Sequence, residues 1–274
     1  MTITQTEFHD LLAAFRSSGP VAFPETWMQG RTAYGGLTAA LCVEAARAEV
    51  DDLPALRSLQ VNFTGPVTDT PSFAARLLRR GRNVSAMGVE ARAGEQSVAS
   101  AQLVFAAARE SQLRADAVAP DCPGWADSEP FVPSGITSSM LKRFVPTFFG
   151  NFEVRLAGGS RPASGAQTGR VLAWVRHADP ASRTGEARDR EAAFVCLGDV
   201  LPPAAFSMLS APAPMSSVNW QLNILRTLDT EEGWFLIETR QTAARDGYSS
   251  QHMRYWDSER ALVGEGMQLV AVFA

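Results

Sequence analysis

The 274-residue chain carries an internal repeat, and this repeat restricts the possible folds more than any other feature of the sequence. An Arg-x-Gly turn signal at residues 79–83 (RRGRN) resembles a second one at residues 245–249 (RDGYS). In each copy the glycine lies 21 residues before the glutamine of a Gln-Leu-Val tripeptide, at Gln102 and at Gln268. A candidate turn lies between each pair. Each copy is therefore predicted to form a strand, a turn and a second strand.

The correspondence extends upstream of the turn signals. Polar residues at alternate positions predict a strand at 58–67 and another at 217–226. Each strand follows an apolar stretch that opens with glycine, at 34–50 in the first copy and at 197–210 in the second. Small and apolar residues at helical spacing predict a largely buried helix in each stretch. Each half of the chain is thus predicted to be a strand, a largely buried helix and then several long antiparallel strands.

The start of the second helix is predicted from its prolines. Pro202 and Pro203 fit only the first turn of a helix, so the helix should begin close to Asp199. When the two copies are aligned, Gly36 stands at the position of Asp199. A plain helix cap would serve both copies alike. A carboxylate kept in one copy alone indicates a single specialised site.

The spacing of about 166 residues between the copies is too long for a solenoid repeat and indicates a duplicated domain. The stretch around 110–140 is rich in proline, glycine and acidic residues, as linkers are. We predict an N-terminal domain at 1–112, a linker at 113–140 and a C-terminal domain at 141–274. Residues 157–170 are predicted to form an exposed hairpin loop.

Charge and composition exclude several classes of protein. The formal net charge is −4, and no basic run is long enough to predict nucleic-acid binding. Three widely spaced cysteines favour neither a disulfide framework nor a metal site. No run of 18 apolar residues predicts a membrane span, and the first residues do not resemble a signal peptide. These features predict a soluble cytoplasmic protein that needs no metal or cofactor.

The stretch 61–105 combines a strand ending in a proline turn, an Arg-x-Gly-Arg motif, and a hairpin closed by a glutamine-containing strand. With its duplication, the chain resembles the double-hotdog acyl-CoA thioesterases, in particular type II. The resemblance implies an α+β double hotdog, in which each of two tandem domains wraps an antiparallel sheet around a central helix. It also implies hydrolysis of acyl-CoA to free acid and coenzyme A, and a homodimer of double hotdogs.

The same resemblance implies the catalytic residues. The aspartate of the family's second hotdog falls on Asp199, its hydroxyl residue on Ser217, and its glutamine on Gln268. Ser216 is a register-shifted alternative to Ser217. The chain departs from the family after the hydroxyl, where Asn219 and Trp220 replace a common Asp-His pair, and after the glutamine, where Glu-Gly is missing.

The three residues suit thioester hydrolysis, which needs a positioned water, a base and donors for the oxyanion. Asp199 is the predicted base. A helix N-terminus would favour its ionised form, while apolar neighbours would disfavour it, so the direction of the net pKa shift stays open. Ser217 and Gln268 are predicted to hold the water between them. The alternative for Asp199 is a helix cap.

Four further residues are candidates for substrate binding. Gly35 and Gly36 either offer bare N–H groups to an oxyanion or phosphate, or allow close packing of the helix. Tyr34 beside them is predicted to line the acyl pocket. Arg82, with Arg79, is a candidate for contact with coenzyme A phosphates, although a solvated hairpin arginine is the commoner outcome.

The alternatives to this reaction are a hydratase, a serine hydrolase and a binding protein without turnover. A hotdog hydratase would pair an aspartate with a histidine at the helix start, but the three histidines lie elsewhere, at His9, His177 and His252. No Gly-x-Ser-x-Gly motif predicts a serine hydrolase. The stronger alternative is a catalytically degenerate double hotdog that binds acyl-CoA or acyl chains without turnover.

Overall fold

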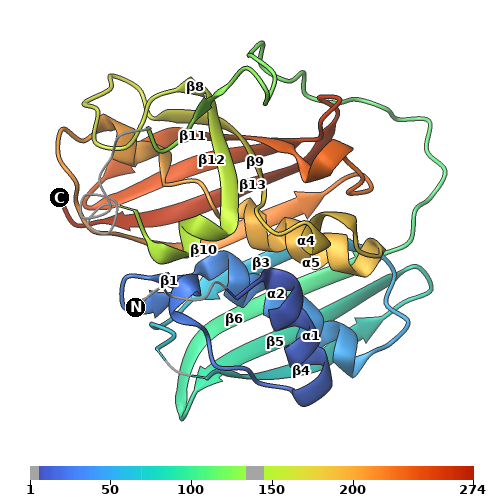
Figure 1. Cartoon of the computed structure of the whole chain (residues 1–274). Helices are drawn as coiled ribbons and strands as arrows, with labels where there is room; N and C mark the ends of the chain where they lie inside the picture. The colour runs from blue at the N-terminus through green and yellow to red at the C-terminus, as the bar shows by residue number, and fades with distance from the viewer. Residues whose placement is uncertain (1–5, 69, 134–144) are drawn as a thin grey trace.

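The computed structural model describes residues 6–68, 70–133 and 145–274. One antiparallel sheet of 11 strands forms the body of the described chain, in the order β4-β5-β6-β3-β10-β13-β12-β11-β9-β8-β7 (Figure 1). The first four of these strands come from the N-terminal half and the other seven from the C-terminal half. The halves join where β3 pairs with β10. This arrangement is the predicted α+β double hotdog.

The N-terminal half contributes two helices, a two-stranded ribbon and four long strands. Its elements are α1 (Phe8–Ser18), η1 (Glu25–Trp27), β1 (Met28–Gln29), β2 (Thr32–Ala33), α2 (Gly35–Glu49), β3 (Leu56–Phe63), β4 (Ser72–Arg80), β5 (Val84–Ala93) and β6 (Gln96–Ala106). The predicted helix at 34–50 is confirmed as α2. The hairpin predicted at 79–83 is confirmed as the turn from β4 to β5.

The C-terminal half repeats this plan with additional strands. Its described elements are β7 (Glu129–Pro130), η2 (Thr147–Asn151), β8 (Phe152–Gly159), β9 (Arg170–His177), α4 (Ala181–Thr184), α5 (Ala187–Gly198), η3 (Ala204–Met208), β10 (Met215–Ile224), η4 (Glu231–Gly233), β11 (Phe235–Arg245), β12 (Tyr248–Trp256) and β13 (Leu262–Val272). The second hairpin, predicted at 245–249, is confirmed as the turn from β11 to β12.

The second helix does not lie where the sequence predicted it. The prediction of a helix at 197–210 is wrong, because α5 ends at Gly198 and only the short 3₁₀ turn η3 follows. A capping box formed by Glu186 and Asp189 starts α5 at residue 187. The two prolines after Leu201 follow the end of the helix, which is the other position that proline favours.

The two central helices lie against the same face of the sheet and pack on each other (Figure 1). Gly36 in the first turn of α2 approaches the end of α5 so closely that a Cβ there would lie 2.2 Å from the carbonyl oxygen of Cys196. Towards the other end, Arg47 of α2 forms a buried ion pair with Glu191 of α5. The start of one helix is therefore fixed against the end of the other.

The boundary between the halves is only partly described. Residues 107–128 hold no helix or strand, in keeping with a linker, but β7 lies inside the predicted linker 113–140 and pairs with β8. The predicted boundary at 140/141 lies outside the described residues. The loop predicted to be exposed at 157–170 instead packs in part on η3, where Ala163 donates to the carbonyl of Phe206.

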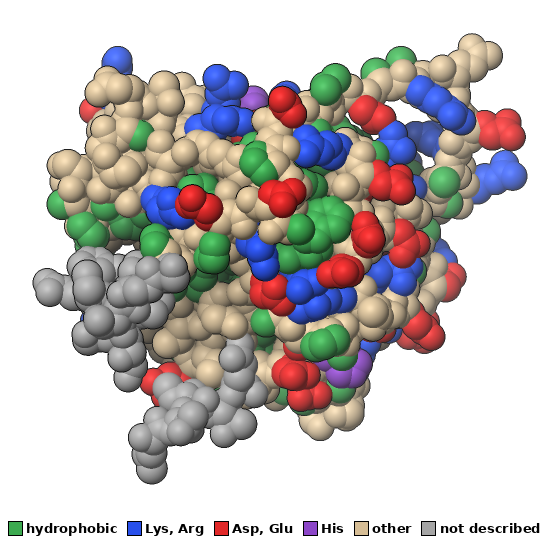
Figure 2. Space-filling view, turned by 45° about the horizontal axis from the view of Figure 1, so that its top comes forward, with side chains coloured by type: hydrophobic (Ala, Val, Ile, Leu, Met, Phe, Trp, Pro, Cys, Tyr) green, Lys and Arg blue, Asp and Glu red, His purple; other side chains and the backbone are tan. Residues whose placement is uncertain are grey.

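The surface carries mixed charge. On the face shown in Figure 2, basic and acidic side chains lie among one another over the described residues. Arg226, for example, pairs with Asp116, and Arg254 pairs with Glu265. Among the described residues, no helix is long and apolar enough to cross a membrane.

Candidate active site

Asp199 lies at the junction of the two central helices. It is the C-cap residue that follows the last residue of α5, so the prediction that it begins its own helix is wrong. Its carboxylate nevertheless faces a helix N-terminus, that of α2, where the backbone N–H of Gly36 bonds to it. A Cβ at Gly35 would lie 2.7 Å from Oδ2 of Asp199. The favourable dipole thus comes from the other half of the chain.

A β-bulge brings Ser217 to the same place. The inward-facing residues of β10 are even-numbered from Trp220 onward, so an unbroken strand would turn Ser217 away from the helices. The register with β13 shifts between Ser217 and Asn219, and Ser217 lies opposite the buried Val270. The bulge therefore re-aims Ser217 toward Asp199, and Ser217 is the serine that Gln268 contacts.

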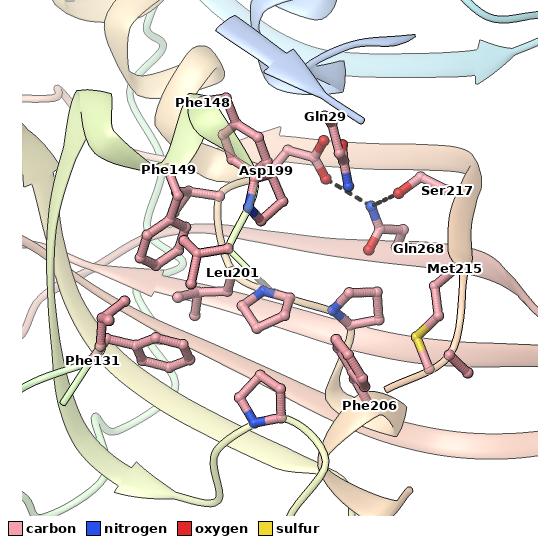
Figure 3. A pocket seen from close by; sticks show the side chains of 18 residues that line it. Gln29, Phe131, Phe148, Phe149, Asp199, Leu201, Phe206, Met215, Ser217 and Gln268 are labelled. Carbon is pink, nitrogen blue, oxygen red and sulfur yellow. Dashed lines mark hydrogen bonds between the residues drawn. The ribbon is translucent and has the colours of Figure 1, made fainter. Parts of the chain in front are cut away.

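Gln268 on β13 connects the two (Figure 3). Its Nε2 donates to Oδ1 of Asp199 at 2.7 Å and to Oγ of Ser217 at 2.9 Å. Its Oε1 accepts a bond of 2.7 Å from Nε2 of Gln251 on β12. The structure thus brings together all three residues that the family resemblance implied.

Gln102, which has the same place in the first copy of the repeat as Gln268 has in the second, differs from it in burial. On β6 the buried neighbours are Ala101 and Leu103, and Gln102 is exposed. On β13, Gln268 itself is buried. The two glutamines occupy equal spacings in sequence but opposite faces of the sheet, so Gln102 is no guide to the role of Gln268.

The environment of Asp199 sets its pKa. Burial raises the pKa to about 7, because it disfavours the charged carboxylate, while the bonds from Gln268 and from the Gly36 N–H act in the opposite direction. Of the two opposing influences on the pKa that were expected from the sequence, burial is therefore the stronger. A carboxyl with a pKa near 7 exchanges protons readily at neutral pH, as a general base must.

Two cavities meet at this residue. One, of about 180 Å³, is mostly apolar, and the other, of about 320 Å³, is more polar. The two cavities share four lining residues: Gln29, Asp199, Met215 and Ser217. Asp199 is half-buried and forms part of the wall of each cavity. A molecule spanning both cavities would pass directly over Asp199 and Ser217.

The apolar cavity is walled by rings (Figure 3). Its lining includes Phe131, Phe148, Phe149, Phe206, Pro146, Pro162, Pro202 and Pro203. The polar cavity runs between the start of α2 and the turn after β3, with Thr32, Gly35, Thr38 and Thr64 among its lining.

Tyr34 does not fulfil its prediction. It lines neither cavity; its side chain is 1% exposed and stacks on Phe148, with ring centroids 4.1 Å apart. Its hydroxyl donates to the carbonyl of Cys196 at 2.7 Å. Tyr34 therefore holds the end of α5 against the start of α2 and supports the cavity wall from behind.

Arg82 does not lie near the candidate site. It is exposed in the β4–β5 turn, and the neighbouring Arg80 pairs with Asp52, just beyond the C-terminal end of α2. The 15-residue helix is about 22 Å long, and Asp199 faces its other end. Arg82 is thus a solvated hairpin arginine, the alternative weighed for it.

Sequence reasoning missed Gln29, Gln251 and the phenylalanines of the apolar cavity. Gln251 carried a detectable signal, because it is a polar residue in a row of alternate buried positions on β12 that includes Met253 and Tyr255. Gln29 carried none, since it lies on the two-residue strand β1 and reaches the site only through tertiary structure.

Solved structures with the same architecture include a hotdog-fold protein of unknown function from Alicyclobacillus acidocaldarius, 25% identical, with a TM-score of 0.79 over 93% of this chain and 92% of that one. A putative thioesterase II from Thermobifida fusca is 20% identical, with a TM-score of 0.77 over 93% and 92%. A TesB protein from Mycobacterium avium subsp. paratuberculosis is 15% identical, with a TM-score of 0.75 over 98% and 100%.

No curated protein matches the sequence. Two family models do match it, and together they cover most of the chain. The model of the acyl-CoA thioesterase N-terminal domain matches residues 23–106, and that of the acyl-CoA thioesterase C-terminal domain matches residues 114–272, which include Asp199, Ser217 and Gln268. The chain belongs to the acyl-CoA thioesterase family.

Proposed function

We propose that this protein hydrolyses acyl-CoA thioesters, with Asp199 as the general base that activates water. The observation that carries the proposal is the meeting of two unlike cavities at Asp199 and Ser217. An acyl-CoA has the same division, an apolar acyl group on one side of the thioester and the polar pantetheine arm on the other. The acyl group would occupy the cavity walled by rings, and the pantetheine arm the polar one.

The reaction needs no covalent acyl-enzyme intermediate. Asp199 takes a proton from water as the water oxygen bonds to the thioester carbonyl carbon. The carbon–sulfur bond then breaks, the sulfur leaves with the electron pair, and the proton held by Asp199 passes to the thiolate. The products are the free acid and the thiol of coenzyme A. Base assistance of this kind contributes about 10²–10⁴-fold to the rate.

Gln268 has a different role from the one predicted. Both of its N–H groups are engaged, one by Asp199 and one by Ser217, and its oxygen accepts from Gln251. It therefore orients the two reacting side chains and does not itself hold the water. Because Ser217 Oγ accepts from Gln268, its own proton is free to be donated to the water or to the developing oxyanion.

The pH dependence of the reaction follows from the pKa of Asp199. Only the ionised carboxylate accepts a proton from water, so kcat/KM is expected to rise as the pH increases through about 7 and to level off above it. The measurement is the rate of thioester cleavage at pH values from roughly 5 to 9. A profile that is flat through neutrality, or one with its midpoint near the ordinary pKa of aspartate, would contradict the assignment.

The size of the apolar cavity predicts the acyl preference. At about 180 Å³ it is comparable to a cavity of roughly 150 Å³ that holds benzene. Phe206→Ala enlarges it and is expected to raise kcat/KM for longer acyl chains relative to shorter ones, by about tenfold or more for a chain that fills the new space. Assays of wild type and variant with a panel of acyl-CoA thioesters measure the ratio of kcat/KM between longer and shorter chains. An unchanged ratio would mean that the acyl group does not bind in this cavity.

The competing function is a protein that binds acyl-CoA without turnover. The same panel, read by release of free thiol, separates the two: hydrolysis of any member that depends on Asp199 supports the enzyme. Binding of acyl-CoA without thiol release across short, long and aromatic acyl groups supports the binding protein. The homodimer implied by the family resemblance stays a prediction, for light scattering to test.

A further inference from the structure

Gln251 is a buried polar residue to which the proposed chemistry gives no part. It lies on β12 directly opposite Gln268 on β13, and it is 1% exposed. Its Oε1 accepts from the backbone N–H of Ala204 at 2.7 Å, and its Nε2 donates to Oε1 of Gln268 at 2.7 Å. A chain of hydrogen bonds therefore runs from η3 through two glutamines to Asp199.

The donor-to-acceptor direction of this series of hydrogen bonds is fixed at the end where Ala204 lies. A backbone N–H can only donate, so the oxygen of Gln251 must face Ala204. The amide group of Gln251 must then face Gln268, which leaves the oxygen of Gln268 as its acceptor. The amide nitrogen of Gln268 is in turn directed at Asp199 and Ser217.

We propose that Gln251 is a positioning residue, which holds the Gln268 side-chain amide in the one orientation that serves the active site. In the reversed orientation, the oxygen of Gln268 would lie where the amide nitrogen now sits, 2.7 Å from Oδ1 of Asp199. Two acceptors would then face each other. Ser217 would also have to donate to Gln268 and would lose the proton it offers to the substrate.

The donor at the fixed end of this chain is the backbone N–H of Ala204. Ala204 is the first residue of η3, and its N–H has no acceptor within that turn. Gln251 satisfies this donor, in a buried place where an unmade bond is costly. The turn that supplies Phe206 to the wall of the apolar cavity thereby also sets the orientation of the Gln268 amide.

Within the described ranges, the other titratable groups that interact with Asp199 stay neutral over the pH range in which Asp199 titrates. They are Tyr34 at the start of α2, Cys196 in α5 and Tyr255 on β12, and burial raises the pKa of each well above its ordinary value. Gln268 and the Gly36 N–H are the hydrogen-bond donors that act on the pKa of the carboxylate. A change in the Gln268 amide therefore shows directly in the titration of Asp199.

The test titrates Asp199 by carbon NMR of the protein labelled in its aspartate carboxyl carbons, with Asp199→Asn to assign the signal. Gln251→Met keeps the length of the side chain and removes its polar atoms. The titration midpoint is expected to move upward, because the amide that stabilises the carboxylate is no longer held in place. An unchanged midpoint in the folded variant overturns the proposal. Gln251→Leu, which also has no donor for Gln268, is the second variant should Gln251→Met not fold.

Kinetics give an independent readout, which rests on the proposed function. Gln251→Met is expected to lower kcat about tenfold with little change in KM. If Gln251 acts through Gln268, the substitution has no further effect on kcat in a Gln268→Met background, whereas a purely structural role gives additive losses. An inactive wild-type protein would refute the hydrolase, yet the NMR titration would still decide the role of Gln251.

A matched control exists in the same sheet. Gln60 on β3 and Gln102 on β6 are also directly opposite each other, but both are exposed. Gln102→Met is expected to leave the titration of Asp199 and kcat unchanged. A shift of equal size in this control would assign the effect to the sheet as a whole and would overturn the proposal.

Discussion

Asp199→Asn is expected to lower kcat for acyl-CoA hydrolysis by about 10²–10⁴-fold in a protein that remains folded. The variant keeps the size of the side chain and an oxygen that can accept from Gln268, but it cannot take a proton from water. The measurement is thiol release under saturating substrate, alongside circular dichroism to establish folding.

Asp52→Asn is the control for this variant. Asp52 is an exposed aspartate paired with Arg80, beyond the far end of α2, and its removal is expected to leave kcat unchanged. If Asp199→Asn retains the wild-type rate, a different group is the base and the mechanism proposed above fails. If both variants lose activity equally, the loss does not come from the base.

The same variant is expected to remove a pH-dependent cost in stability. The folded-state pKa of Asp199, about 7, lies above the ordinary value of 3.8, so between these pH values the folded protein holds a proton that the unfolded chain has released. Stability therefore falls as the pH rises across this window, by up to about 1.4 kcal/mol per pH unit. Asp199→Asn lacks this titration. Its unfolding free energy, relative to wild type, should increase from pH 4 to 7 and level off above.

The strands could be predicted from sequence because the signals that define them are local. An Arg-x-Gly turn and an alternating pattern are each contained in about ten residues, and both hairpins lie where these signals placed them. The second helix was misplaced for the opposite reason. Proline favours both the first turn of a helix and the residues after its end, so Pro202 and Pro203 alone could not orient it. The capping box at Glu186 and Asp189 was the signal that settles its start.

The site was reached through the family resemblance, while its geometry depends on long-range structure. Ser217 faces inward only because of a bulge, which is a property of pairing with β13 and not of its own strand. The helix N-terminus that faces Asp199 belongs to α2, more than 150 residues away in sequence. The orientation of Gln268 is set by Gln251 and the N–H of Ala204, which belong to two other elements. None of these relations is encoded in the spacing of residues along the chain.

Gly36→Ala is expected to destabilise the protein by about 3 kcal/mol, although glycine-to-alanine changes within helices ordinarily stabilise by up to about 1 kcal/mol. The added Cβ would lie 2.2 Å from the carbonyl oxygen of Cys196 and 2.6 Å from the ring of Tyr34, so α2 and α5 must move apart. Chemical denaturation measures the loss, and thermal unfolding should show a midpoint lower by roughly 10 °C.

Gly124→Ala tests whether this loss is specific, because a Cβ at Gly124 meets no atom within 4 Å, and a change within about 0.5 kcal/mol is expected there. Moving α2 away from α5 also withdraws the Gly36 N–H from Asp199, so the carboxylate loses one of the groups that favour its charged form. In Gly36→Ala the midpoint of the pH–rate profile should therefore shift upward together with the loss of stability. A variant that is as stable as wild type would mean that the helices are not in close contact at Gly36. A destabilised variant with an unshifted profile would mean that the N-terminus of α2 does not act on the base.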